Sequence, residues 1–293
     1  MRKFLSVILL SCTWISLSYA QSGPGPQRIV STLPSSTEML FAVGAGDQVV
    51  GVTRFCKFPP EAQEKTIIGG LLDINYEIIY SLNPDLAVIQ AGEGENKTMF
   101  EKMKIPVLEI ETRSMDGIIK SIRDIGAAVG RIKEAEEVAG NIERKIQFIE
   151  DKVSALNKPR VLVTFLRPVG DGEIHDVYIA GNHTFFNDVI KIAGGQNAYE
   201  GYRVVTSPVV NAEGIIQMNP DVIIELMGDL PQKDFSVEQA LKDWGMLSDL
   251  SAYKNKRIYI MDKQYAGIPG PRITMTLDEV ARYVHPETHW GTE

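Results

Sequence analysis

Short apolar runs of strand length alternate with helical patterns along most of the chain. The runs are bounded by Gly, Pro, Asn and Asp, which favour turns. The predicted strands lie at 28–32, 49–52, 86–90, 107–110, 161–165, 177–180 and 257–261. The predicted helices lie at 35–43, 75–82, 97–103, 184–193, 237–241 and 271–284. This alternation is typical of an α/β fold.

One segment of this pattern occurs twice. The sequence from Leu82 to Glu93 returns 136 positions later, from Met218 to Asp229, with Asn, Pro, Asp and Gly at the same spacing. An apolar run separates these residues in both copies, and an acid follows the Gly each time. The repeat indicates two lobes of similar design, with a cleft between them.

A different pattern separates the two copies. From Ile132 to Leu156 apolar residues recur every three or four positions, and Pro159 follows. This spacing predicts a single amphipathic helix of about 35 Å, at 1.5 Å per residue. A coiled coil is the alternative, although the small Ala135 and Ala139 favour a spacer packed inside the molecule. We therefore expect an N-terminal lobe at 28–131, an inter-lobe helix at 132–157 and a C-terminal lobe at 158–287.

The first twenty residues differ from the rest. Arg2 and Lys3 precede an apolar run, and a small-x-small site ends at Ala20. Residues 1–20 are therefore predicted to be a signal peptide that directs the protein to the periplasm. Leu9-Leu10-Ser11-Cys12 also fits a lipobox, so a lipoprotein anchored through Cys12 is the alternative.

Composition narrows the class of protein. The chain is 44% hydrophobic and 23% charged, as expected of a globular protein. Its net charge of −8 becomes −10 once the leader with Arg2 and Lys3 is removed, which argues against nucleic acid as a partner. Cleavage leaves Cys56 as the only interior thiol, so no intrachain disulfide is expected.

Two loops are the first candidates for ligand contact. Ser35 and Glu38 have the spacing of a capping box, which would open a helix at the carboxyl end of the first strand and direct free N–H groups into the cleft. Arg54, Phe55 and Cys56 follow the second strand, and their cationic and aromatic groups suit a flat or anionic ligand. Cys56 is a candidate metal contact or a small packed residue.

Metal and catalytic chemistry have little support. The four histidines show no compact ligand spacing; His183 is a candidate for lining the cleft, whereas His285 and His289 are expected to be exposed. No nucleophile elbow or phosphate loop is present. We therefore predict no metal site and no catalytic residue. An exported α/β hydrolytic enzyme remains an alternative, because an α/β cleft can host hydrolysis.

Several segments together carry a family resemblance. They are Arg28–Glu38, Val50–Thr53, Phe58–Ala62, Asn83–Leu86, Gly194–Asn197, Pro269–Ile273 and Ala281–Glu287. In order and spacing the chain resembles the vitamin B12-binding and ferric-siderophore-binding periplasmic proteins of ABC importers. The resemblance implies two Rossmann-like α/β lobes joined by a single long rigid α-helix. It also implies a monomer without a cofactor, which holds its ligand between the lobes and delivers it to a membrane permease with a cytosolic ATPase.

The resemblance places vitamin B12 or a related corrinoid first among ligands, with a ferric siderophore or haem as the alternative favoured by several arginines. Four stretches match ligand loops of the family: Gly69–Leu71, Gln90–Ala91, Thr206–Pro208 and Gln264–Ala266. The predicted ligand-binding residues are Pro34, Ser35, Arg54, Phe55, Cys56, Arg167, His183, Tyr202, Arg203 and Tyr265. By the same resemblance, the acids that would dock on permease arginines are Glu93, Glu95 and Asp229.

Overall fold

The computed structural model describes residues 25–201, 205–228 and 236–291. The predicted signal peptide with Cys12, and the predicted site residues Tyr202, Arg203 and Asp229, lie outside these ranges. None of the helices in the described ranges combines the length and the apolar character needed to cross a bilayer.

The N-terminal lobe is a five-stranded parallel sheet in the order β3-β2-β1-β4-β5. Its strands are β1 (Ile29–Ser31), β2 (Val49–Val52), β3 (Thr66–Ile67), β4 (Leu86–Gln90) and β5 (Val107–Ile110). Its helices are α1 (Pro34–Ala42), α2 (Tyr76–Leu82), α3 (Gly94–Lys102) and α4 (Met115–Ala128), with short 3-10 turns at Gly46–Gln48 and Pro60–Glu64. The strand order reverses between β1 and β4, so a crevice is expected at the carboxyl ends of these strands.

The C-terminal lobe has a mixed sheet in the order β11-β10-β6-β7-β9, with β8 beside the start of β6. Its strands are β6 (Arg160–Phe165), β7 (Val177–Ile179), β8 (Gln196–Asn197), β9 (Val209–Val210), β10 (Val222–Leu226) and β11 (Ile258–Met261). Its helices are α6 (Phe185–Ile192), α7 (Ala212–Met218), α8 (Val237–Asp243), α9 (Ser251–Lys254) and α10 (Ile273–Val284), with a 3-10 turn at Trp244–Leu247. β6, β10 and β11 are parallel, whereas β7 and β9 are antiparallel additions to this core.

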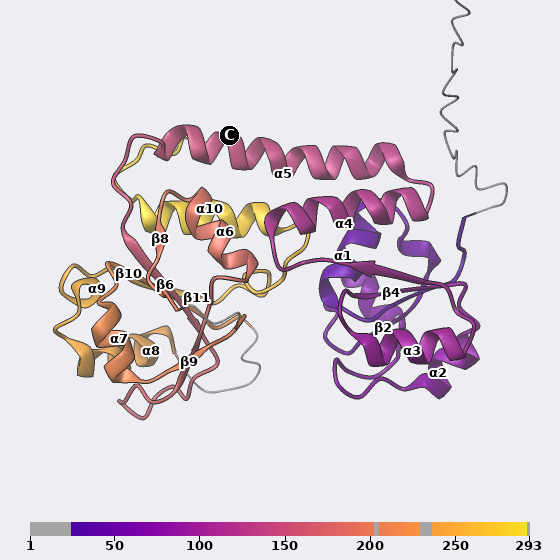
Figure 1. Cartoon of the computed structure of the whole chain (residues 1–293), viewed down its shortest axis with the longest axis horizontal. Helices are drawn as coiled ribbons and strands as arrows, with labels where there is room; N and C mark the ends of the chain where they lie inside the picture. The colour runs from indigo at the N-terminus through magenta and orange to yellow at the C-terminus, as the bar shows by residue number, and fades with distance from the viewer. Residues whose placement is uncertain (1–24, 202–204, 229–235, 292–293) are drawn as a thin grey trace, which may run out of the picture.

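Helix α5 (Ile132–Val153) lies along both lobes (Figure 1). It packs against α4 of the N-terminal lobe and against α10 of the C-terminal lobe. Its buried face consists of Ala135, Ala139, Ile142, Ile149 and Val153, which are five of the apolar positions that predicted the helix. Helix α4, a second amphipathic helix, was not predicted. It is capped by Ser114, whose side chain accepts a hydrogen bond from Gly117 N at 3.0 Å.

The repeated segment forms the same helix–turn–strand unit in each lobe, α2–β4 and α7–β10. Asn83 and Asn219 end the two helices in the left-handed conformation, with φ of 47° and 39°. Asp85 accepts hydrogen bonds from the backbone N–H groups of Gln27 and Arg28, both at 2.8 Å. Asp221 does the same for Arg160 N at 2.9 Å. The spacing that the two copies share therefore reflects the end of a helix and the attachment of the neighbouring strand.

The predicted capping box at the start of α1 is wrong, although the helix itself is confirmed. Pro34 occupies the first helical position, Leu33 is the N-cap, and no side chain caps the helix. Ser35 is buried in the first turn. Glu38 accepts two hydrogen bonds from Arg272, at 2.6 and 2.9 Å, instead of bonding back to the backbone. A guanidinium forms a stronger, charge-assisted pair with a carboxylate than a backbone amide does.

Candidate ligand-binding cleft

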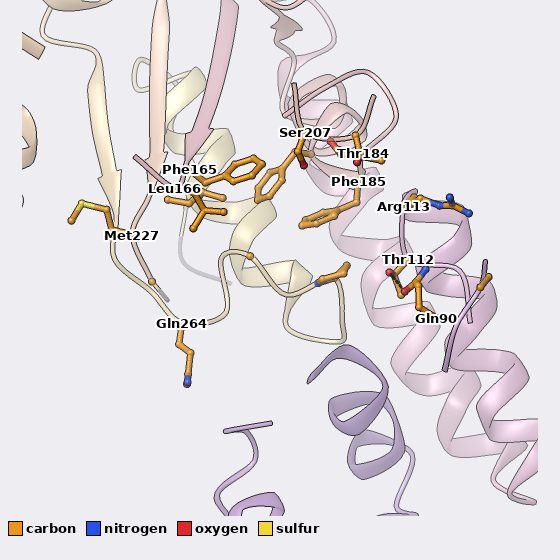
Figure 2. A pocket seen from close by; sticks show the side chains of 17 residues that line it. Gln90, Thr112, Arg113, Phe165, Leu166, Thr184, Phe185, Ser207, Met227 and Gln264 are labelled. Atoms are coloured by element: carbon orange, nitrogen blue, oxygen red, sulfur yellow. Dashed lines mark hydrogen bonds between the residues drawn. The ribbon is translucent and has the colours of Figure 1, made fainter. Parts of the chain in front are cut away.

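A cavity of about 550 Å³ lies between the two lobes (Figure 2). Its walls come from the carboxyl ends of β4, β5, β6, β10 and β11 and from the start of α6. Open α/β sheets bind ligands at this edge. The lining residues are Gln90, Ala91, Thr112, Arg113, Phe165, Leu166, Thr184, Phe185, Phe186, Thr206, Ser207, Leu226, Met227, Gly228, Gln264, Gly267 and Pro269.

The C-terminal lobe supplies most of the apolar wall. Phe185 and Phe186 lie with their ring centroids 4.3 Å apart at the start of α6. Leu166, at the end of β6, is 62% exposed, and its φ of 52° lies in the left-handed region. Met227 follows β10 on the same side. Such a wall suits a large ligand with flat apolar faces.

The N-terminal lobe supplies polar groups. Figure 2 shows Gln90 and Thr112 on one side of the cavity and Phe165 and Leu166 on the other. The Thr112 hydroxyl donates to Gln90 Oε1 at 2.8 Å. Arg113 donates from Nε to Glu111 Oε1 at 3.0 Å, and this guanidinium lowers the pKa of the Glu111 carboxyl more strongly than partial burial raises it. Among the described lining residues Arg113 is the only cation, and it is paired within the protein.

Arg167 does not face the cleft, so this prediction is wrong. Its side chain is 1% exposed and pairs with Glu225 at 2.6 Å and Asp243 at 2.7 Å. The buried indole of Trp244 donates to the same Glu225 at 2.8 Å. Leu166 takes the cleft-facing position after β6, and the next side chain turns into the lobe.

Cys56 is also buried, at 2% exposure. Its sulfur accepts a hydrogen bond from Thr37 Oγ1 at 3.1 Å and shares a second hydrogen bond with Thr53 Oγ1 at 3.3 Å. Burial raises the pKa of the Cys56 thiol despite these bonds. The prediction that Cys56 contacts the ligand is therefore wrong, and the alternative of a small packed residue holds.

The remaining predicted residues near α1 and β2 lie off the lining of this cavity. Pro34 and Ser35 belong to the first turn of α1, and Ser35 is buried. Arg54 pairs with Asp73, with Nη1 2.8 Å from Oδ1, and Phe55 is 48% exposed. Their part in ligand binding stays a prediction.

Tyr265 and His183 lie beside the cavity. Tyr265 follows the lining residue Gln264, and its hydroxyl donates to Glu279. Burial and the hydrogen bond to Glu279 raise the pKa of this phenol. His183 lines a second cavity that adjoins the first. Contact of either side chain with a ligand stays a prediction.

The ligand loops matched by sequence are placed better than the individual side chains. Gln90–Ala91, Thr206–Ser207 and Gln264 all line the cavity, whereas Gly69–Leu71 does not. The residues of the apolar wall were not among the predicted ligand-binding residues: Phe165, Leu166, Phe185, Phe186 and Met227. Their positions in the sequence could have indicated this wall. These residues follow predicted strands or begin a predicted helix, at the edge of the sheet where ligands bind.

The described residues contain no group of three or more His, Cys, Asp or Glu side chains placed to hold a metal ion. His285 is 2% exposed, and its Nδ1 lies 2.9 Å from Glu287 Oε1, so its predicted exposure is wrong. The end of α10 folds back over it through Trp290, whose indole donates to His285 O at 3.1 Å. His289 is exposed as predicted.

The predicted docking acids of the N-terminal lobe lie close to the cleft. Glu93 is the N-cap residue of α3, and its carboxylate accepts a hydrogen bond from Asn96 Nδ2 at 2.8 Å. Glu95 lies in the first turn of α3 and is exposed.

Two α/β lobes with a cleft at the carboxyl ends of their strands form a ligand-binding architecture. The chain matches the family model described as periplasmic binding protein over residues 29–265, and it belongs to this family. An uncharacterised ABC transporter substrate-binding lipoprotein of Bacillus subtilis is 30% identical over 271 residues, 90% of this chain and 81% of the relative. The protein is therefore an ABC transporter substrate-binding protein of the B12, siderophore and haem group.

Other relatives differ in the ligand that their names give. A cobalamin-binding protein of Halobacterium salinarum is 25% identical over 90% of this chain and 70% of its own length. The structure of the periplasmic vitamin B12-binding protein of Vibrio cholerae has a TM-score of 0.76 at 20% identity, covering 89% of this chain and 98% of that one, and shows the shared fold. A periplasmic haem-binding protein of Roseiflexus has a TM-score of 0.73 at 27% identity, covering 89% and 99%.

Proposed function

We propose that the cleft captures vitamin B12 or a related corrinoid and delivers it to a membrane permease. The observation that carries the proposal is the chemistry of the described lining. This lining is mainly apolar, its one cation, Arg113, is paired with Glu111, and its other hydrogen-bonding groups are neutral. A corrinoid presents a flat macrocycle edged with neutral amide arms, so apolar walls and groups such as Gln90 and Ser207 suit it.

An anionic iron chelate fits this lining less well. Such a ligand favours unpaired arginines that bind its charge directly. Of the arginines predicted for that role, Arg54 is paired with Asp73 and Arg167 is buried with Glu225 and Asp243. Arg203 lies outside the described residues.

Haem is the second candidate, and Met227 favours it. A thioether is an established axial ligand of haem iron. Met227 lines the cavity together with Arg113. The Arg113 guanidinium can donate to a haem propionate in place of the Glu111 carboxylate. A haem-binding protein at 27% identity supports the same candidate.

Isothermal titration of the purified mature protein with cyanocobalamin, haemin and a ferric siderophore tests the proposal. We expect saturable binding of cyanocobalamin and none of the siderophore. A haem Soret shift that Met227→Ala removes and Met275→Ala keeps would replace the corrinoid with haem, because Met275 is exposed on α10, away from the lining. Saturation with none of the three would contradict the proposal.

We infer that the protein is exported, as a soluble periplasmic protein or a lipoprotein anchored through Cys12, and works as a monomer with a permease and its ATPase. The relative named a lipoprotein supports the anchored form. The variant Cys12→Ala distinguishes the two forms. It should release the protein from isolated membranes only if a lipid on Cys12 anchors the wild-type protein.

We propose that Glu95, with Glu93 and Asp229, docks on permease arginines. Glu95 is exposed, whereas the Glu93 carboxylate already accepts a hydrogen bond from Asn96. Glu93→Gln with Glu95→Gln should lower uptake by cells roughly fivefold, since exposed ion pairs contribute about 0.2–1 kcal/mol each. Cyanocobalamin affinity should not change. Glu101→Gln, an exposed acid of the same helix, is the control, and equal uptake by all variants would contradict this docking role.

A further inference from the structure

A second cavity, of about 660 Å³, adjoins the cleft. The two cavities share Arg113, Thr184 and Thr206 as walls, so we name the second one the side chamber. Both lobes contribute to it, as they do to the cleft. Its lining residues are Glu111, Arg113, Ser114, Asn182, His183, Thr184, Asp188, Val205 and Thr206.

The chemistry of the side chamber differs from that of the cleft. Its described lining contains no Phe, Tyr, Trp or Met, and Val205 is the only aliphatic residue among these lining residues. Glu111 and Asp188 are acceptors, whereas Arg113 and His183 are donors. The ligand part that fills such a space must itself carry both hydroxyl donors and acceptor oxygens.

The walls of the side chamber are fixed from both lobes. Arg113 is held by Glu111 in the N-terminal lobe, with Nη2 2.5 Å from Oε2. Asp188 of α6, in the C-terminal lobe, accepts a hydrogen bond from Met115 N at the start of α4 at 3.0 Å. The chamber is therefore a formed space between ordered groups.

His183 is the available group in this chamber. It is exposed, and across residues 25–201, 205–228 and 236–291 its side chain makes no hydrogen bond or ion pair. The neutral imidazole offers one donor and one acceptor. It can therefore bond to a phosphate oxygen or to a sugar hydroxyl without first breaking a contact within the protein.

We propose that the side chamber binds the ribose-phosphate arm of a complete corrinoid, so that the protein selects complete corrinoids over forms truncated at that arm. This inference rests on the proposed corrinoid function. The macrocycle occupies the apolar cleft, while the arm extends past the shared wall of Arg113, Thr184 and Thr206. The ribose hydroxyls then donate hydrogen bonds to the carboxylates of Glu111 and Asp188, and His183 donates a hydrogen bond to the phosphodiester.

Cyanocobalamin and dicyanocobinamide, which lacks the ribose-phosphate arm, test the proposal by titration calorimetry. Cyanocobalamin carries one cyanide and its own base on the cobalt, and dicyanocobinamide carries two cyanides, so an unchanged visible spectrum on binding shows that His183 does not coordinate the metal. We expect the wild-type protein to bind cyanocobalamin about tenfold more tightly, the ratio that one or two retained hydrogen bonds provide. Equal affinities would overturn the proposal and leave the corrinoid function standing. If the protein bound neither probe, both the side-chamber proposal and the corrinoid function would be overturned.

Variants of His183 test whether the side chamber is the part of the protein that distinguishes the two probes. His183→Ala should weaken cyanocobalamin binding about fivefold, the loss of about one net hydrogen bond, and leave dicyanocobinamide unchanged. His183→Trp, which narrows the chamber with a bulky indole, should weaken cyanocobalamin binding further and leave dicyanocobinamide binding unchanged. His289→Ala, an exposed histidine off both cavities, should change neither affinity. If His183→Trp weakens both probes equally, the side chamber does not hold the arm.

Discussion

Leu166 combines a branched side chain, a left-handed backbone and 62% exposure at the cleft. A residue other than glycine pays about 1–2 kcal/mol in this conformation. Exposure means that the side chain recovers little of this free energy through packing within the protein. Strained residues of this kind persist mostly where they serve a site. We infer that Leu166 is positioned to contact the bound ligand.

Leu166→Gly should therefore separate stability from binding. The free energy of unfolding should change by less than about 1 kcal/mol, because relief of the left-handed strain offsets the greater freedom of glycine in the unfolded chain. Cyanocobalamin affinity should fall about tenfold with the lost apolar contact. Urea unfolding and calorimetry measure the two effects. Lys256→Gly relieves the same strain, at φ 56° and away from the cleft, and should leave affinity unchanged.

Asp243 gives a pH-dependent prediction. Burial raises its pKa, but hydrogen bonds from Arg167, Gly170 N and Gly172 N outweigh burial and hold the pKa below its usual value of 3.8. A carboxyl whose pKa is lowered by folding stabilises the protein above the unfolded pKa and loses that contribution as pH falls through the folded one.

Asp243→Asn should lower the free energy of unfolding by about 3 kcal/mol at pH 7, because it leaves Arg167 short of a buried charge partner. The difference from the wild type should narrow as the pH falls below about 4, because the Asp243 carboxyl of the unfolded wild-type chain takes up a proton there while the folded one stays charged. Urea unfolding at pH 7 and pH 3 measures it. Asp249→Asn, a fully exposed acid, should have little effect at either pH. A difference that stays constant with pH would contradict the role assigned to the Asp243 charge.

At the scale of elements, local signals predicted most of the fold. Strands β4 and β5 begin and end at the predicted residues, because apolar runs and adjacent turn residues define both ends. The capping box failed because Glu38 finds Arg272, 234 positions away, which no local motif reports. Helix α4 was not predicted, although its buried residues Ile118, Ile122 and Ile125 have helical spacing.

The repeated helix ends give the element-scale prediction. Asn83 stops α2 at φ 47°, and Asn tolerates this conformation better than other residues with a side chain. Asn83→Ala should lower the free energy of unfolding by about 1 kcal/mol, whereas Asn83→Gly should be close to neutral. Urea unfolding of the two variants measures the difference. Equal losses would mean that the amide side chain, and not the backbone conformation, is what the position requires.

At the scale of the molecule, the sequence predicted where the cleft lies but not which side chains face it. Strand ends and the repeat locate the crevice, and three of the four predicted ligand loops line it. The side chains depend on how the chain turns after each strand. After β6 the turn at Leu166 presents that residue to the cleft and directs Arg167 into the lobe, and only the folded backbone distinguishes the two.

One buried ion pair links the lobes directly. Glu38 on α1, with its side chain 2% exposed, pairs with Arg272, the N-cap residue of α10. The Arg272 guanidinium also lies 4.0 Å from the ring centroid of Phe58 in the N-terminal lobe and 5.7 Å from that of Tyr265 in the C-terminal lobe. Burial raises the pKa of Glu38, and Arg272 opposes that rise. The pair therefore favours one spacing of the two lobes.

Arg272→Met should lower the free energy of unfolding by about 3 kcal/mol, because it leaves the Glu38 carboxyl buried without a partner. The double variant Glu38→Met with Arg272→Met should recover most of this loss, since replacing both members of a buried pair with apolar groups is often close to neutral. A cycle of the wild type, both single variants and the double variant in urea measures the coupling free energy. Losses that simply add would show that the pair does not couple the lobes.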